Sequence, residues 1–175
     1  MAELRKMNPA TLTDYLVREA APAVFGPGSK LYIIDHHHHA RAYLGVGVGV
    51  MVLRIQTDWS GLSPRDFWRR MFQRSWAYPY DSFGRGPLDP EMFPATVLGL
   101  VDDIYRSLAW AVEERGGFLE TDVPFAEFHW AAYFRGKVRI GPSDQEFRRA
   151  VSEAMILSRS PEAASLPGYR GENTR

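Results

Sequence analysis

The sequence contains no cysteine. This absence excludes a disulfide framework, a thiolate metal site and a cysteine nucleophile. The 175 residues also include no apolar run that approaches the ~20 residues of a membrane-spanning helix, and residues 1–5 do not open a signal peptide. We therefore expect a cytoplasmic protein with no membrane partner.

Net charge is absent as well, because 21 Lys and Arg balance 21 Asp and Glu. This balance argues against a broadly basic nucleic-acid binder. Residues 1–75 nonetheless hold ten Lys and Arg against six Asp and Glu, whereas residues 76–135 hold four against ten. The first part of the chain is therefore the better place for an anionic ligand.

Four consecutive histidines, His36–His39, stand out against this ordinary composition. Residues 31–34 before them predict a short buried strand, and Ala40, Arg41 and Ala42 after them are good helix formers. A helix N-terminus leaves backbone N–H groups unpaired and carries about half a positive charge, so it suits an anion such as phosphate. The order predicts an anion site at residues 35–39. A structural turn without a ligand is the alternative.

Two further segments allow more than one interpretation. Arginines are interleaved with aromatic residues over 65–74, which is typical either of a nucleic-acid surface or of a core stripe with solvated arginines. Residues 75–94 are rich in Pro, Gly, Tyr and Asp and predict a long ordered loop. We expect this loop to lie beside the histidine turn and to supply Tyr80 or Asp81 to it.

Periodicity and capping signals predict the remaining elements. They are a helix after Asn8, a hairpin of strands 22–25 and 31–34, a strand over 46–55, and helices after Ser63, over 96–115, over 124–134 with Asp122 as cap, and after Ser143. The order predicts an α+β fold, a small mixed sheet with helices and a helical C-terminal extension. We expect a single domain over residues 1–159, its last helix at 143–159, and a disordered tail over 160–175.

The stretch Tyr32-Ile-Ile-Asp-His-His-His-His-Ala-Arg-Ala42 resembles the Asp-Gly-His-His-Arg motif of the ParB/sulfiredoxin superfamily, and its ParB-like nuclease branch above all. Similar segments follow at Phe67-Trp68, Tyr78-Pro79-Tyr80-Asp81, Tyr105-Arg-Ser-Leu-Ala-Trp110, Gly116-Gly117 and Pro124-Phe-Ala-Glu-Phe128. The resemblance covers about residues 20–140 and implies the ParB/sulfiredoxin fold for this core. His36 stands where the superfamily has glycine, which suits a positive φ, and His39 stands where it has arginine.

The resemblance implies a nuclease or other phosphoester hydrolase. His37, His38 and Asp35 occupy the motif and are the expected catalytic residues, since an imidazole can act as acid or base near neutral pH. The expected phosphate- or nucleotide-binding residues are His36, His39, Arg41, Tyr80, Asp81 and Arg106. Asp35 and His37 are also candidate ligands for a divalent metal such as Mg²⁺ or Mn²⁺, whose presence the sequence does not decide.

A non-catalytic module that binds CTP, ATP or DNA through the same turn is the alternative, because it needs the phosphate cradle but no nucleophile. Sulfiredoxin chemistry is excluded, since it requires a cysteine. The connection over 116–123 is too long for a helix-turn-helix, so centromere binding of the partition-protein kind is not expected. The expected partner is nucleic acid or a nucleotide.

Overall fold

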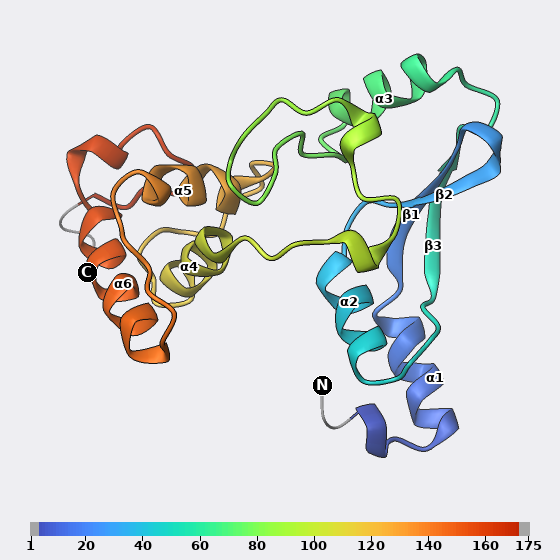
Figure 1. Ribbon diagram of the computed structural model, residues 1–175, viewed down its shortest axis with the longest axis horizontal. Coiled ribbons are helices and arrows are strands. Elements are labelled where there is room, and N and C mark those ends of the chain that lie inside the picture. Colours follow the sequence, from blue (N-terminus) through green and yellow to red (C-terminus); the bar gives the residue numbers. More distant parts are fainter. Residues whose placement is uncertain (1–3, 172–175) are drawn as a thin grey trace. The chain divides into compact units, whose positions relative to one another are not determined.

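The predicted hairpin forms, and its first strand is the centre of a three-stranded sheet. The computed structural model describes residues 4–171. Strand β1 (Ala21–Gly26) pairs antiparallel with β2 (Lys30–Ile33) and parallel with β3 (Leu53–Asp58), which gives the strand order β2-β1-β3. This mixed sheet and its helices confirm the predicted α+β fold (Figure 1).

Helices make up most of the remaining regular structure. The α-helices are α1 (Pro9–Arg18), α2 (His37–Gly45), α3 (Pro64–Gln73), α4 (Ile104–Glu113), α5 (Ala126–Arg135) and α6 (Asp144–Leu157). Short 3-10 helices are η1 (Leu4–Lys6), η2 (Pro27–Ser29), η3 (Pro90–Met92), η4 (Val97–Gly99) and η5 (Pro161–Ala163). The predicted caps are confirmed: Asn8 begins α1, Ser63 begins α3 and Ser143 forms a capping box with Glu146 at α6.

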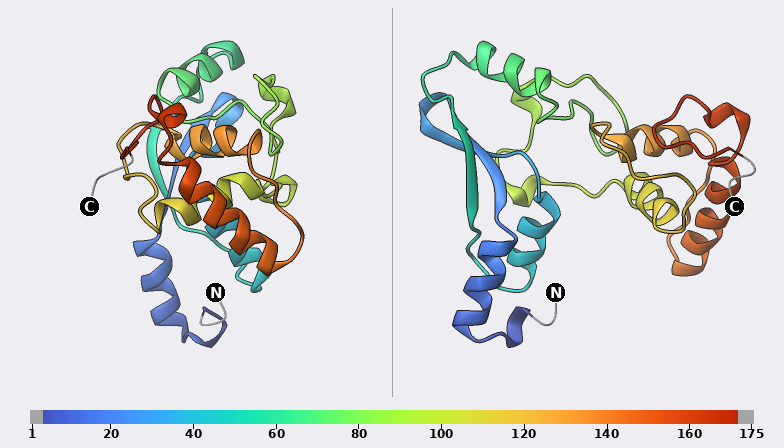
Figure 2. Two further views of the ribbon diagram at one scale, coloured as in Figure 1. Left: turned by 90° about the vertical axis from the view of Figure 1, so that its left-hand side faces the viewer. Right: turned by 180° about the vertical axis from the view of Figure 1, so that it is seen from behind.

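The chain divides into two compact units. Unit 1 comprises Met1–Pro79 and Pro87–Leu100, and unit 2 comprises Tyr80–Gly86 and Val101–Arg175. The division falls inside the range 1–159 that the sequence assigns to one domain. The right-hand view of Figure 2 shows α4, α5 and α6 gathered in unit 2, and the strands with α1 and α2 gathered in unit 1.

The core of unit 1 is built on β1. Val24 is fully buried and packs with Trp59, Phe67 and Met71, so that α3 covers one face of the strand. Close approach requires glycine at the end of β1, because a Cβ at Gly26 would lie 2.5 Å from the Tyr32 ring. A second cluster joins α1 to α2, and its buried members are Leu4, Leu16 and Tyr43.

The core of unit 2 is a cluster of buried side chains from α4, α5 and α6. The rings of Phe118 and Trp130 stack at 4.4 Å between centroids, and the Trp130 Nε1–H donates to the Pro167 carbonyl at 2.7 Å. Residues 161–167 are thus held by the core, with η5 formed and Ala163 buried. This packing corrects the predicted disorder for residues 160–171, while residues 172–175 lie outside the described range.

The predicted strand over 46–55 begins too early. Residues 46–52 lack strand structure because Gly47 turns the chain with φ 82°, and Val46, Val48 and Met51 pack onto the cluster around Tyr43. β3 therefore begins only at Leu53.

Two predicted helix starts are also wrong. The helix expected over 96–115 begins at Ile104, because the Asp103 carboxylate accepts hydrogen bonds from the backbone N–H groups of Tyr105 (2.9 Å) and Arg106 (3.3 Å). The helix expected at 124 begins at Ala126, and its cap is Phe125 in a left-handed conformation (φ 60°) instead of Asp122.

Asp103 should be a major stabilising residue of unit 2. Its second oxygen accepts from Arg135 Nη2 at 2.6 Å, and both side chains are largely buried. We predict that Asp103→Ala lowers the free energy of unfolding by about 2–4 kcal/mol, because it removes the cap and leaves Arg135 unpaired. Asp103→Asn keeps a capping oxygen, so its free energy of unfolding should fall by about 1 kcal/mol less than that of Asp103→Ala. Urea unfolding measures both, with exposed Asp102→Ala as the control, and equal losses in all three variants would contradict the assignment.

Candidate functional site

The histidine turn begins with a left-handed residue. β2 ends at Ile33, and His36 has φ 62° and ψ 25° before α2 starts at His37. Asp35 supports this bend, because its Oδ1 accepts a hydrogen bond from the His36 backbone N–H at 2.6 Å. The positive φ expected from the superfamily's glycine is therefore present, although the residue here is histidine.

The turn presents the amino end of α2. The first intrahelical bond runs from the Ala40 N–H to the His36 carbonyl at 3.0 Å. The N–H groups of His37, His38 and His39 consequently have no partner within the helix, as at every helix start. These N–H groups and the helix dipole give the turn positive potential, while anion binding there stays a prediction.

His37 is the most specifically placed of the four imidazoles. Its Nε2 lies 3.1 Å from the Ile33 carbonyl oxygen, and because that oxygen can only accept, Nε2 carries the proton and Nδ1 keeps a lone pair. Burial lowers the pKa of His37 from 6.5, against smaller opposing effects of the Ile33 bond and of Asp35. His37 is thus held neutral with a basic Nδ1, as a general base requires.

His36 and His39 are arranged differently, as part of a stack along α2. Their ring centroids lie 5.0 Å apart, and His39 lies 6.0 Å from the ring of Tyr43. Within residues 4–171 the Nδ1 atoms of both histidines are buried without a hydrogen-bond partner. These two side chains therefore retain unused polar atoms next to the turn.

Tyr43 is a member of this stack that the sequence analysis did not single out. Its ring is buried, and burial together with the neighbouring Tyr15 hydroxyl raises the pKa of Tyr43 to about 12. The signal for it was its position four residues after His39, which places both on one helix face. It anchors the stack to the core of unit 1.

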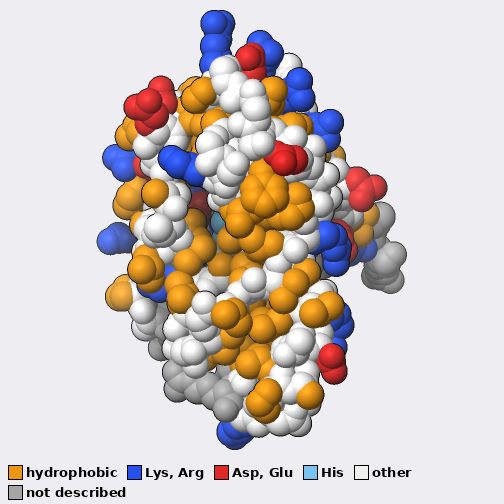
Figure 3. All heavy atoms as spheres, turned by 90° about the vertical axis from the view of Figure 1, so that its right-hand side faces the viewer, with side chains coloured by type: hydrophobic (Ala, Val, Ile, Leu, Met, Phe, Trp, Pro, Cys, Tyr) orange, Lys and Arg blue, Asp and Glu red, His pale blue; other side chains and the backbone are white. Residues whose placement is uncertain are grey.

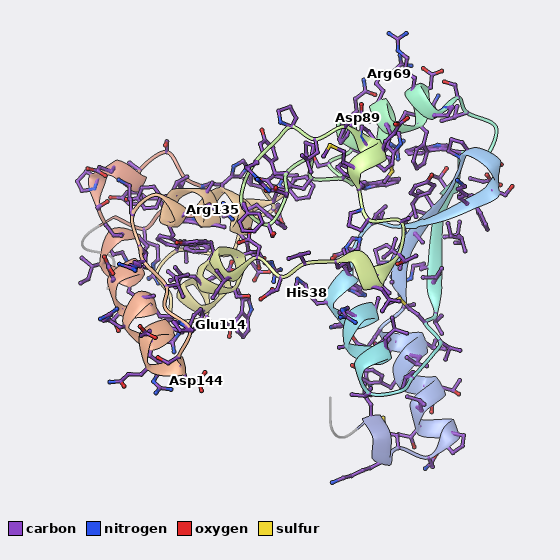
Figure 4. All side chains as sticks on the ribbon, in the orientation of Figure 1. His38, Arg69, Asp89, Glu114, Arg135 and Asp144 are labelled. Atoms are coloured by element: carbon purple, nitrogen blue, oxygen red, sulfur yellow. The ribbon has the colours of Figure 1, made fainter. Side chains whose placement is uncertain are left out.

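His38 and Arg41 are the exposed members of the site. Figure 4 labels His38 at the start of α2. Arg41 follows His37 by four residues and His38 by three, so all three share one side of the helix. Unit 1 therefore brings together a neutral base, a solvent-accessible imidazole and a guanidinium.

The three remaining predicted residues are Tyr80, Asp81 and Arg106, and all three belong to unit 2. Asp81 accepts from the N–H groups of Phe83 and Arg85, and its ion pair with Arg85 is 2.8 Å long. Arg106 pairs with Glu127, and Tyr80 is 40% exposed. Their participation at the histidine turn stays a prediction.

Metal binding finds limited support in the side chains. Over residues 4–171, no group of three or more His, Cys, Asp or Glu side chains is arranged to hold a metal ion. Asp35 is the carboxylate of the turn, and one of its oxygens is already engaged with the His36 N–H. The turn therefore offers fewer ligands than a self-sufficient Mg²⁺ or Mn²⁺ site.

A cavity of about 460 Å³ lies elsewhere, in unit 2. Its lining includes the carboxylates of Glu113, Glu114, Glu120 and Glu127. Burial, and then the surrounding carboxylates, raise the pKa of Glu113. This acidic lining repels phosphate, so the cavity does not compete with the histidine turn as the anion site.

Comparison with known proteins agrees with the fold. The sequence model of one family, described as "Putative ParB-like nuclease", matches residues 1–136. The crystal structure of protein Atu1540 from Agrobacterium tumefaciens is similar, with a TM-score of 0.82 and 34% sequence identity over 93% of this chain and 88% of that one. No curated protein matches the sequence. No helix in residues 4–171 is long and apolar enough to cross a membrane.

The left-handed backbone at His36 gives a first test of the turn. We predict that His36→Gly raises the free energy of unfolding by about 0.5–1 kcal/mol, because glycine adopts φ 62° without steric cost. His36→Ala should be destabilising, since alanine has neither that freedom nor the imidazole. Chemical denaturation measures both variants. If His36→Gly loses as much stability as His36→Ala, then the imidazole ring, and not the backbone conformation, determines the contribution of residue 36 to stability.

The lowered pKa of His37 gives a second test, in the pH dependence of stability. As the pH falls below 6.5, the unfolded chain binds a proton at this residue before the folded protein does, so stability is lost on acidification towards the lowered pKa. We predict that His37→Gln makes the free energy of unfolding fall less steeply below pH 6.5. Denaturation at several pH values measures this slope, with exposed His38→Gln as the control. Identical slopes in wild type and His37→Gln would contradict it.

Proposed function

Because this chain belongs to the ParB-like nuclease family, we propose that it is a phosphoester hydrolase that acts on nucleic acid or a nucleotide at residues 35–39. The observation that carries this proposal is the placement of a neutral, hydrogen-bonded His37 at a helix N-terminus. His37 supplies a base, and the helix N-terminus supplies positive potential for phosphate.

The imidazoles divide the proton transfers between them. His37 Nδ1 accepts a proton from the attacking water, while the Ile33 carbonyl fixes the tautomer and the ring. His38 is exposed at the next position and donates a proton to the leaving oxygen. Asp35 holds the backbone of His36 and stabilises the protonated form of His37 after proton transfer.

Charge on the phosphate is neutralised mainly by the backbone. The first N–H groups of α2 bind its oxygens, and Arg41 from the same side of the helix adds a fork of donors. His36 and His39 are proposed as further phosphate or nucleotide ligands because they belong to the same turn, although their Nδ1 atoms are buried. Tyr80, Asp81 and Arg106 are proposed as additional phosphate or nucleotide ligands on the strength of the family resemblance alone.

The alternative function is a non-catalytic nucleotide or DNA-binding module. The helix N-terminus and Arg41 suffice for it, whereas the tautomer of His37 would have no role. The lowered pKa of His37 favours the enzyme, because binding an anion would benefit from a protonated imidazole, and a lowered pKa opposes protonation.

Substitution of the two central histidines tests the proposal. We predict that His37→Ala and His38→Ala each lower turnover of labelled DNA or nucleotide by about 10² to 10⁴, the usual contribution of a general acid or base. His129→Ala is the matched control, since His129 is an exposed helical histidine of unit 2. Assays with and without EDTA show whether a divalent metal takes part.

Binding is measured separately in the same variants. Inorganic phosphate should shift the NMR signals of the His38 ring in wild type and should leave those of His129 unchanged. Unchanged turnover in both histidine variants would remove the catalytic assignment and leave the binding module. Histidine signals that do not respond to millimolar phosphate would remove the anion site as well.

A further inference from the structure

Helix α3 carries a cluster of arginines whose charges are mostly uncompensated. Arg65, Arg69, Arg70 and Arg74 are all exposed, and the helix has a single acidic residue, Asp66. Asp66 pairs with Arg69 at 2.7 Å. Within residues 4–171, neither Arg70 nor Arg74 forms an ion pair. In Figure 3, Lys and Arg side chains gather at the top of the molecule, where α3 lies.

Two of these arginines rest on a tryptophan pair. The rings of Trp59 and Trp76 stack at 5.4 Å between centroids. The guanidinium carbon of Arg74 lies 5.2 Å from one ring centroid and 5.1 Å from the other, and that of Arg70 lies 5.7 Å from Trp59. An arginine held over a ring loses less side-chain freedom when it binds a ligand, and its N–H donors stay free for that ligand.

The opposite flank of α3 has a different character. Trp68 and Phe72 lie there and pack against Phe93 at 5.1 and 6.4 Å, and two acidic residues, Asp89 and Glu91, precede Phe93 in the chain. Positions 70 and 74 are half a turn or so away from positions 68 and 72. The positive potential of the helix is therefore concentrated on the flank of Arg70 and Arg74. Figure 4 shows Arg69 extending outward from the helix.

The same helix is joined to the histidine turn through β2. The ring of Tyr32 lies 4.6 Å from Phe67 and 5.6 Å from Trp68, and Ile34 packs on the same cluster. Ile34 immediately precedes Asp35 in the chain, and Tyr32 lies three residues before it. α3 and the turn are therefore parts of one packed unit.

We infer that the flank formed by Arg70, Arg74, Trp59 and Trp76 binds the phosphate backbone of a nucleic acid. This inference rests on the proposed function, because it specifies that the phosphoester substrate is a nucleic-acid polymer and not a single nucleotide. Arginine forks match phosphate geometry, and a row of them one helical turn apart suits a polyanion better than a single nucleotide. Trp59 is buried beneath the arginines, so its face is closed to bases and binding is independent of sequence.

The test is binding of 5′-labelled 16-nucleotide single-stranded DNA, its duplex and the matching RNA, followed by fluorescence anisotropy in EDTA. R70A/R74A should weaken binding about tenfold at low salt. It should also reduce the slope of log K against log salt by about 1.4 for single strands and about 1.8 for duplex, as two lost phosphate contacts require. R148A/R149A removes the same charge from exposed positions on α6 and should change neither quantity.

Further variants keep the inference separable from the proposed function. In an H37A/H38A background, which lacks turnover, R70A/R74A should still weaken polymer binding and lower the salt slope by the same factors as in wild type. Should R70A/R74A fail to fold, R70Q/R74Q removes the charges while keeping longer side chains, and R70K/R74K should restore the salt slope.

Equal affinity in wild type and R70A/R74A would overturn the inference that this flank of α3 binds nucleic acid. Loss of binding in H37A/H38A alone would also overturn it and leave the histidine turn as the site of contact. Normal binding without any turnover would instead reject catalysis and retain the surface.

Discussion

Hydrogen bonding along both edges of β1 is the constraint on which unit 1 depends. β2 occupies one edge and β3 the other, and the ladders continue beyond the strands through the Ile34 N–H to Pro22 and the Trp59 N–H to Phe25. Since Ile34 is still paired, the chain is free to leave the sheet only at Asp35. The position of the histidine turn follows from where this pairing ends. The buried residues of β1 are Ala21, Ala23, Val24 and Gly26, which are small or β-branched, whereas Pro22 and Phe25 are only partly buried.

Local signals predicted the elements that local chemistry decides. Caps placed the starts of α1, α3 and α6, and the glycine of the superfamily motif indicated the backbone of His36. The bond from His37 to the Ile33 carbonyl was beyond prediction, because it spans a left-handed bend whose geometry no spacing rule describes. The apolar spacing over 96–115 predicted a helix that is too long at its start. The spacing extends upstream of Asp103, but the Asp103 carboxylate caps the helix, which therefore begins at Ile104 and not at residue 96.

The site combines a strained backbone with a desolvated base, and both reduce stability locally. A left-handed histidine costs energy that glycine would not, and a partly buried imidazole loses hydration. The surroundings offset part of this through the Asp35 hydrogen bond, the His39 stack and the attachment of Tyr43 to the core. Local costs of this kind are often found at functional sites, and they agree with the role proposed for this turn.

The two units are interleaved along the chain. Residues 80–86 belong to unit 2, although unit 1 both precedes and follows them. There the Arg135 guanidinium donates to the Ser82 carbonyl, and a Cβ at Gly84 would lie 2.6 Å from that guanidinium. The shortest continuous piece that contains all of unit 2 therefore also carries residues 87–100 of unit 1. A single recombination point therefore cannot separate the two units, because a piece that carries one unit whole also carries a segment of the other.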